Sequence, residues 1–313
     1  MSGGSALPVA DTRRLCGWRV SSAVPLPELL PWTGAERSPD LTIGLAPVPP
    51  RLEAVVAEHP LLQVAADGRC RFEMPGVAVY LVDAAGRRVT IDPVLPPAAP
   101  DIRAFLLSTV FAILCHRRGL LALHGACVEI GGRAVVLAGP SGIGKSMLAG
   151  HLMGCGHALL ADDVTVVDTA APGGPVVLPT VPQLTLGTDA LQQLAASAAS
   201  TEPVRPGLDR RRLPVADRFR AAPLPLSAVV HLDVSRGHGG DPMRRLNGAE
   251  AVAWLGRDLY RAALARRLKA TGHLLPAMIA VAGAPLGSRV LLHGHEPGGL
   301  RRSVDIIRER LQP

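Results

Sequence analysis

A stretch of eight residues near the middle of the chain has the composition and spacing of a phosphate-binding loop. It reads GPSGIGKS and fits the pattern G-x-x-x-x-G-K-[ST]. A hydrophobic segment, residues 134–138, precedes the loop, and a predicted helix, residues 145–153, follows it, as the motif requires. The candidate nucleotide-binding residues are Gly139, Ser141, Gly142, Ile143, Gly144, Lys145 and Ser146.

The residue types in this loop suit the chemistry of a bound phosphate. Glycines let the backbone approach the anion, and successive N–H groups and the following helix N-terminus then face it. Lys145 is expected to reach the β- and γ-phosphates, and the Ser146 hydroxyl to bind Mg²⁺. Only two of the 33 basic residues are lysines, so a lysine at this position is a specific choice.

Two aspartates follow the loop at a sequence spacing that lets the chain bring them back beside it. An apolar run, residues 158–161, is followed by Asp162 and Asp163. Asp162 comes 17 residues after Lys145. One short helix and a turn fit into that interval. We therefore expect both carboxylates at the end of a strand beside the loop, near the metal and the γ-phosphate.

A second local signal concerns the strand that enters the loop. Residues 127–130 and 133–138, which are mostly apolar, flank Gly131-Gly132, which is a two-residue hairpin signal. The strand before the loop should therefore have an antiparallel neighbour. The predicted fold class is α/β, with a mixed sheet around the loop rather than an all-parallel one.

The overall composition argues against several classes of protein. The 313 residues are 48% hydrophobic, enough for about two domains with substantial cores, and the net charge is +7. The basic residues are spread along the whole chain, and no nucleic-acid-binding module is evident. Five cysteines show no paired metal spacing, and neither a secretory signal nor a membrane-length apolar run is present. We expect a cytoplasmic protein that binds neither nucleic acid nor membrane.

The motifs together resemble the catalytic domain of the HPr kinase/phosphorylase family. The matching features, in order and spacing, are His124-Gly125, the loop, and Gly156-His157 leading into Ala161-Asp162-Asp163. The preceding residues 117–124, RRGLLALH, look like one branch of that family, the HPr-kinase-like proteins of lasso-peptide biosynthetic clusters. The resemblance covers about residues 104–168 and is diffuse elsewhere.

This resemblance implies ATP and Mg²⁺ as cofactors, a serine hydroxyl of a peptide or protein as phosphoryl acceptor, and a homo-oligomer. Lys145 and His124 would lie in the catalytic site. Asp162 is the first candidate for the base and Asp163 for the metal-side carboxylate, although the two roles could be exchanged. No motif for adenine is visible, so GTP stays open as an alternative to ATP.

Departures from HPr kinase itself affect the expected reaction and acceptor. Met147 stands where bifunctional members usually carry an acid, and their later phosphorylase signature is not recognisable. We expect kinase activity without efficient phosphorolysis, and a lasso-type precursor peptide rather than HPr as acceptor. The alternatives are a small-molecule kinase acting on free serine or another metabolite, and a nucleotide-gated regulatory protein.

Prolines mark the expected domain boundary. Four lie within residues 93–100, so residues 1–100 should form an α+β scaffold or docking domain, and residues 101–313 the catalytic domain. In the first, strands are expected at 41–45, 62–65, 77–82 and 89–91, and a helix at 52–58. A helix over 101–118, with Asp101 as N-cap and Gly119 as terminator, should open the second.

The remaining segments carry weaker signals. Residues 201–222 contain six arginines, and among them Arg210, Arg211 and Arg212 could bind nucleotide phosphates or an acidic peptide, or could be solvated. Helices are expected at 188–194, 249–268 and 300–311, and strands at 164–167 and 224–234. His293 and His295 lack helical zinc spacing and are assigned to a loop.

Overall fold

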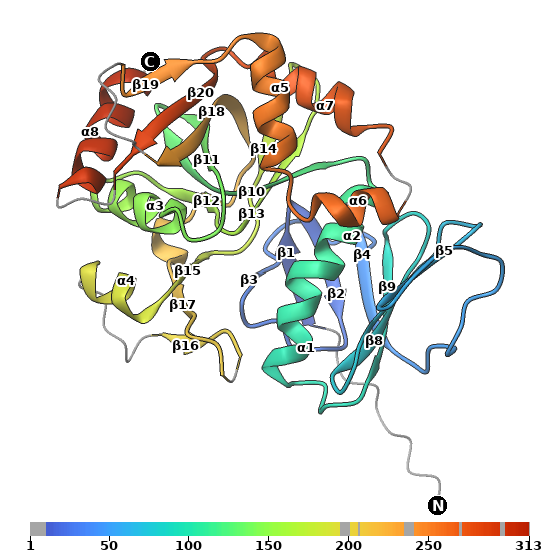
Figure 1. The fold of residues 1–313 in the computed structure, drawn as a ribbon. Coiled ribbons are helices and arrows are strands. Elements are labelled where there is room, and N and C mark those ends of the chain that lie inside the picture. Colours follow the sequence, from blue (N-terminus) through green and yellow to red (C-terminus); the bar gives the residue numbers. More distant parts are fainter. Residues whose placement is uncertain are drawn as a thin grey trace, which may run out of the picture. The chain divides into compact units, whose positions relative to one another are not determined.

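The computed structural model describes residues 11–194, 201–205, 207–234, 241–268, 271–294 and 298–312. Contacts divide the chain into two compact units, the first ending at Leu114 and the second beginning at Cys115 (Figure 1). The division falls later than the boundary that the prolines suggest at residue 100. The helical segment after the prolines belongs to the first unit because its rings pack there: Phe105 lies against Phe72, and Phe111 against Trp18.

A mixed sheet makes up most of the first unit. The strand order in the described residues is β3-β1-β2-β4-β9-β8-β7-β6-β5, with β2–β4 and β4–β9 parallel and the other neighbours antiparallel. Alternate residues face the core: Val89 and Ile91 of β9 are fully buried. The strands are β1 (Asp11–Leu15), β2 (Trp18–Ser22), β3 (Leu30–Pro31), β4 (Leu41–Leu45), β5 (Val55–His59), β6 (Leu62–Ala65), β7 (Cys70–Met74), β8 (Ala78–Val82) and β9 (Arg88–Pro93).

The helix after the prolines has three parts: α1 (Pro100–Phe105), a π-helical turn η1 (Leu106–Val110) and α2 (Phe111–Arg117). The expectation that Asp101 caps it is wrong. Ala99 is the N-cap and Pro100 takes the first helical position, where its missing N–H costs nothing. The helix ends as expected before Gly119, whose φ is +68°.

A mixed sheet also forms the centre of the second unit, as the hairpin signal predicts. The order in the described residues is β11-β10-β13-β14-β18-β20-β19, and β12 pairs with β10. Strands β10 and β11 are antiparallel, whereas β11–β18 and β18–β20 are parallel. The bounds are β10 (Leu121–Ile130), β11 (Arg133–Ala138), β12 (Leu159–Ala161), β13 (Val164–Asp168), β14 (Val176–Leu178), β18 (Leu224–Val234), β19 (Met243–Arg245) and β20 (Gly287–His293).

Helices cover the two faces of this sheet, because side chains along β11 alternate between two cores. Val135 and Leu137 pack with α3 (Lys145–Gly154) and α8 (Gly299–Leu311). Ala134 and Val136 pack with α5 (Gly248–Arg257), α6 (Ala262–Arg267) and α7 (Leu274–Ala282). The site loop therefore leaves a strand that is buried on both sides, which gives it a rigid base.

A smaller sheet lies beside α3 and carries part of the arginine-rich span (Figure 1). Its order is β15-β17-β16, all antiparallel. The strands are β15 (Gln183–Leu186), β16 (Glu202–Pro203) and β17 (Arg211–Pro214), and α4 (Thr188–Gln193) follows β15, close to the expected bounds. The arginine-rich span is thus partly a strand rather than a solvated loop.

Three further sequence-based assignments are wrong. Residues 52–58 contain β5 instead of a helix, because that segment pairs antiparallel with β6. The single helix expected over 249–268 is broken into α5 and α6, and the intervening residues pair with β10, with Leu259 opposite Leu123. His293 ends β20 instead of lying in a loop, and His295 lies outside the described residues.

Among the described helices, none has both the length and the apolar character needed to cross a membrane.

Candidate functional site

The loop that follows β11 adopts a conformation that needs its glycines. Gly139, Gly142 and Gly144 have φ values of +148°, +84° and +101°. Space is limited as well, since a Cβ on Gly139 would lie 3.2 Å from the Leu232 carbonyl oxygen, and one on Gly144 would lie 3.0 Å from His293 Nε2. Both backbone freedom and close approach therefore demand glycine. Ile143 is buried in the core beneath the loop and anchors it.

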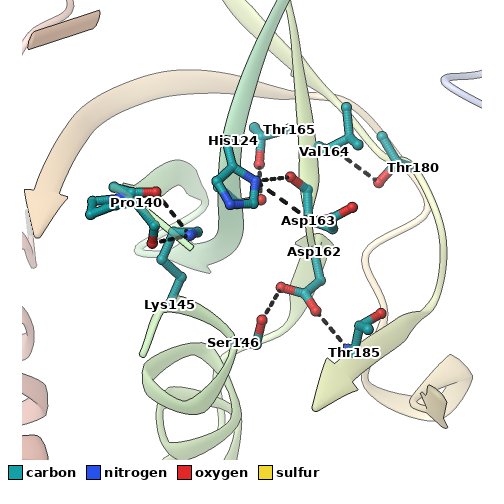
Figure 2. Close-up of polar contacts among 12 residues, drawn as sticks. His124, Pro140, Lys145, Ser146, Asp162, Asp163, Val164, Thr165, Thr180 and Thr185 are labelled. Carbon is teal, nitrogen blue, oxygen red and sulfur yellow. Dashed lines mark hydrogen bonds and ion pairs between the residues drawn. The ribbon is translucent and has the colours of Figure 1, made fainter. Parts of the chain in front are cut away.

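Lys145, the first residue of α3, is folded back over the loop. Its side chain is 6% exposed, and Nζ donates hydrogen bonds to the carbonyl oxygens of Gly139 (2.8 Å) and Pro140 (2.9 Å), as Figure 2 shows. Burial lowers the pKa of Lys145, while the Asp162 and Asp163 carboxylates oppose that change. The ammonium is therefore held against two carbonyl oxygens of the loop.

Asp162 is joined to the loop by Ser146. The Ser146 hydroxyl donates to Asp162 Oδ1 at 2.7 Å, and the Thr185 amide donates to Oδ2 at 2.7 Å (Figure 2). Burial raises the pKa of Asp162 from its usual 3.8 to about 6, although both hydrogen bonds act in the opposite direction. A serine hydroxyl and a carboxylate at this separation are an oxygen pair that suits Mg²⁺.

Asp163 lies on the other side of the strand end and meets His124. The chain turns sharply between β12 and β13, with Asp163 at φ +66°, so consecutive carboxylates point to different partners. His124 Nδ1 lies 3.1 Å from the Asp163 carbonyl oxygen and 3.5 Å from its Oδ1. Because a carbonyl oxygen only accepts, Nδ1 carries the hydrogen in this arrangement.

The environment of His124 favours the neutral imidazole. Burial lowers its pKa, the nearby Lys145 ammonium lowers it further, and Asp163 opposes both. The backbone is fixed too, because the His124 amide donates to the Asp258 carbonyl oxygen at 2.8 Å. His124 thus lies between the lysine and an aspartate, positioned by β10 and by the segment between α5 and α6.

These groups converge on a cavity of about 220 Å³. It is lined by most of the predicted nucleotide-binding residues together with His124, Asp163 and Arg210. A second cavity, of about 490 Å³, shares His124, Ser141 and Asp163 with the first. Its remaining wall is formed by Gly139, Pro140 and residues 257–261. Asp163 and His124 therefore stand between two cavities, only one of which contains the lysine of the loop.

The three candidate arginines separate in the structure. Arg210 lines the first cavity, together with Lys145. Arg211 instead donates from Nε to the Thr201 hydroxyl (2.6 Å) and from Nη2 to the Thr201 carbonyl oxygen (2.7 Å). Arg212 is 6% exposed on β17, which pairs with β15. Of the three, Arg210 has the placement of a ligand contact.

Sequence reasoning missed part of this site. Thr185 contributes only a backbone amide, which no side-chain pattern reveals. Residues 258–260 come from what the sequence presents as the middle of a helix, and only their pairing with β10 brings them to the cavity. His293 packs against Gly144 from the end of β20, and its Nδ1 is hydrogen-bonded to the Ser303 hydroxyl at 2.9 Å.

Comparisons with known proteins find similarity in this part of the chain. Residues 119–177 match the family described as "HPr Serine kinase C-terminal domain". The "Putative HPr kinase/phosphorylase 2" of Oceanobacillus iheyensis is 47% identical over 47 residues, 15% of each chain. The "HPr kinase/phosphorylase" of Polaromonas naphthalenivorans is 31% identical over 115 residues, 36% of this chain and 33% of the relative. The chain therefore spans a third or less of the length of these curated relatives.

A solved structure with similarity to this chain is the Hpr(Ser) kinase/phosphatase from Coxiella burnetii. The match covers 61% of this chain and 96% of the other, with a TM-score of 0.33 and 13% sequence identity. A score this low does not establish a common fold. The local sequence match is the more specific finding, since residues 119–177 contain His124, the loop and both aspartates.

Proposed function

We propose that this protein is a kinase that transfers the γ-phosphoryl group of Mg·ATP to a serine hydroxyl of a peptide or protein. The observation that carries the proposal is the junction of two cavities at Asp163 and His124, beside Lys145 of the loop. A phosphoryl donor and an acceptor need separate sites that meet at the transferred group. The relatives that match here are HPr kinase/phosphorylases, which supports the same reaction class.

The roles of the two aspartates are better assigned in the exchanged order. Asp162 shares a hydrogen bond with Ser146, the hydroxyl that the motif assigns to the metal, so Asp162 takes the metal side. Asp163 has no place in that pair and lines both cavities, so Asp163 is the base toward the acceptor. This reverses the first choice made from the sequence and follows the alternative that was left open there.

The residues of the chain then divide the reaction between them. The loop N–H groups and Lys145 hold the phosphates, since this chemistry depends on positioning and charge neutralisation. Asp163 takes the proton of the acceptor hydroxyl, whose oxygen forms a bond to the γ-phosphorus as the bond to the bridging oxygen of ATP breaks. The electron pair of that bond leaves with ADP. His124 Nδ1 faces both the backbone carbonyl oxygen and the carboxylate of Asp163, and so orients that residue.

A divalent cation fits the same arrangement. Ser146 Oγ and Asp162 Oδ1, 2.7 Å apart, are hard oxygen donors of the kind Mg²⁺ takes, usually beside phosphate oxygens and water. Bound there, Mg²⁺ would neutralise charge on the β- and γ-phosphates. Asp162 must be ionised to serve as a ligand, and the Ser146 hydroxyl and Thr185 amide both favour that state.

For the acceptor, the finer proposal is a precursor peptide of the lasso type. Its support is the resemblance of residues 117–124 to that branch, together with Met147 and the missing phosphorylase signature. An extended peptide loses conformational entropy on binding, so charged anchors are useful, and the arginine-rich span 201–222 borders the first cavity through Arg210.

The experiment offers the full-length protein Mg·ATP with equal amounts of HPr, a serine-terminated precursor peptide and free serine, and identifies the products by mass spectrometry. Transfer to the peptide supports the proposal. Preferential modification of HPr would overturn the lasso-type acceptor while keeping the kinase. Transfer to free serine alone would make the protein a small-molecule kinase, and nucleotide binding without any transfer would favour the regulatory alternative.

A further inference from the structure

The second cavity carries two arginines to which the proposed reaction gives no role. Arg257 and Arg261 line it together with His124 and Asp163, the residues assigned to the acceptor hydroxyl. Neither arginine lines the first cavity, which contains Lys145 and most of the loop. Two positively charged side chains therefore belong to the acceptor's side of the site.

The Arg257 side chain is supported by an aromatic ring. Its guanidinium carbon lies 3.6 Å from the centroid of the Trp254 ring, within the range of a cation–π contact. Trp254 belongs to α5, as Arg257 does, and packs against the buried cluster of Leu246, Ala251 and Val290. The packed ring restricts the positions that the guanidinium can take.

The carboxylate next to Arg257 in the chain engages it only weakly. Asp258 Oδ1 lies 3.4 Å from Arg257 Nε, a long contact, whereas Asp258 Oδ2 lies 2.7 Å from His231 Nδ1. The Asp258 and His231 side chains are 2% and 0% exposed, and that of Arg257 is 45% exposed. Among the described residues, Nη1 and Nη2 of Arg257 have no hydrogen-bond partner, so both can bind a ligand.

The backbone between the two arginines is fixed against β10. The His124 amide donates to the Asp258 carbonyl oxygen at 2.8 Å, and Leu259 pairs with Leu123. Arg257 directly precedes this paired segment and Arg261 directly follows it. Both arginines are therefore held at set places beside the strand that carries His124.

The charges of the cavity favour an anionic acceptor. Burial lowers the pKa of His124, which favours the neutral imidazole, and Asp258 is only 3% exposed. Among the described residues that line this cavity, the charges left open to an acceptor are those of Arg257, Arg261 and Asp163. A guanidinium presents a planar set of donors that matches a carboxylate with two parallel hydrogen bonds. The arginines thus suit a carboxylate, and Asp163 the hydroxyl.

We propose that Arg257, with Arg261 beside it, binds a carboxylate of the acceptor and so selects a serine that has a negative charge next to its hydroxyl. The carboxylate is either the terminal one of a C-terminal serine or that of an acidic side chain beside an internal serine. The cavity volume, about 490 Å³, lies within the range of roughly 300–1,000 Å³ of sites that enclose small ligands. The inference rests on the proposed kinase reaction, with the second cavity as the acceptor's site.

The test varies the charge of the peptide, with the full-length protein and Mg·ATP. One pair of peptides ends in serine, as the free acid or the amide. A second pair, both amidated, has an internal serine followed by glutamate or glutamine. In at least one pair the carboxylate form should have a kcat/KM at least about tenfold higher, the order expected for one charge-assisted hydrogen bond. That pair identifies the source of the carboxylate, and ratios below about threefold in both pairs would overturn the inference.

Arg257→Gln removes the charge from the cavity wall. It should bring that ratio below about threefold, and raise the KM for the peptide more than the KM for ATP. Arg37→Gln is the matched control, because Arg37 also lies over a tryptophan, 5.1 Å from the Trp32 centroid, but lines neither cavity. The control should keep the ratio of the parent. An Arg257→Gln protein that also keeps it would overturn the role of Arg257.

Calorimetric titration separates this inference from the proposed function. With Mg·ADP present, the carboxylate form of at least one pair should bind at least about tenfold more tightly than its neutral form, whether or not transfer occurs. Equal Kd values within both pairs would overturn the carboxylate site. A parent without transfer to any acceptor would overturn the proposed kinase instead.

Discussion

The Ser146 hydroxyl donates a hydrogen bond of 2.7 Å to Asp162, whereas the next residue, Asp163, faces His124. The separation arises from the positive φ of Asp163, which turns the chain between β12 and β13. Two adjacent carboxylates are thereby placed in different environments. Asp162 is buried, 8% exposed, and bonded to the loop, while Asp163 opens onto both cavities.

The first prediction follows from this separation. Asp163→Asn should lower kcat for phosphoryl transfer at least about 100-fold, the range of general-base contributions. Its affinity for Mg·ADP should stay within about threefold of the parent, because the Ser146–Asp162 pair is intact. Calorimetric titration with Mg·ADP and a mass-spectrometric transfer assay measure the two quantities.

Asp162→Asn serves as the matched variant, since it makes the same chemical change one residue earlier. It should weaken Mg·ADP binding about tenfold or more, because one oxygen ligand of the cation loses its charge. The reverse pattern, with transfer lost and Mg·ADP affinity retained in Asp162→Asn, would restore Asp162 as the base.

The second prediction concerns Lys145. Its Nζ is held by the carbonyl oxygens of Gly139 and Pro140, at the loop that the motif assigns to phosphates. Lys145→Ala should reduce the rise in Tm caused by Mg·ADP or Mg·ATP to less than about half that of the parent, since stabilisation by a bound ligand falls with the logarithm of its Kd. Lys145→Arg, which keeps the charge, should give an intermediate shift. An undiminished shift in the alanine variant would contradict the nucleotide assignment.

The third prediction separates two adjacent arginines. Arg210 lines the cavity with Lys145 and Ser146, whereas both ends of the Arg211 guanidinium are bonded to Thr201. Arg210→Ala should therefore raise the KM for ATP about tenfold, the loss expected for one charge-assisted phosphate contact. Arg211→Ala is the control and should leave that KM within about twofold. Steady-state kinetics with ATP and peptide varied separately would show a peptide effect instead if Arg210 serves the acceptor.

Local signals account for what the sequence predicted well. Gly131-Gly132 between two apolar runs produces the β10–β11 hairpin, with both glycines at positive φ. The loop motif lies where a buried strand meets α3, and the apolar run before Asp162 becomes β12. In each case the residues that decide the conformation are close together in the chain, so pattern and structure agree.

Long-range pairing accounts for what the sequence did not predict. A single helix was expected over residues 249–268, yet hydrogen bonds to Ala122 and His124 break it at Asp258 and Tyr260. The partner strand is more than 100 residues away in the chain, so no local pattern contains it. Which aspartate meets Ser146 is hidden for a different reason, because it depends on the backbone turn at Asp163 and not on residue type.

The last prediction concerns the pH dependence of stability and a histidine outside the site. His116 ends α2, is 3% exposed, and neither of its ring nitrogens has a hydrogen-bond partner among the described residues. The His273 ring lies 5.9 Å away, centroid to centroid. Burial, together with the neighbouring His273 and Arg117, lowers the pKa of His116 from 6.5 to about 4. The folded protein therefore holds His116 neutral where the unfolded chain binds a proton.

The sign of the effect follows from proton binding. Between pH 6.5 and about 4 the unfolded chain carries the extra proton, so the free energy of unfolding falls as pH drops through this range. Protonation of His116 lowers the free energy of unfolding by about 3 kcal/mol in full, and it has no effect at pH values above the unfolded pKa of 6.5. Urea unfolding of the parent at pH 7 and pH 5 should therefore give a lower midpoint at pH 5.

His116→Leu removes the titrating group and should reduce that difference between pH 7 and pH 5. The matched control is Leu120→Ala, a buried apolar residue nearby in the chain, which should lower the midpoint at both pH values equally. The comparison isolates protonation from packing, because only one of the two variants changes a group that binds a proton. A His116→Leu protein with the same pH difference as the parent would show that the acid sensitivity arises from other groups.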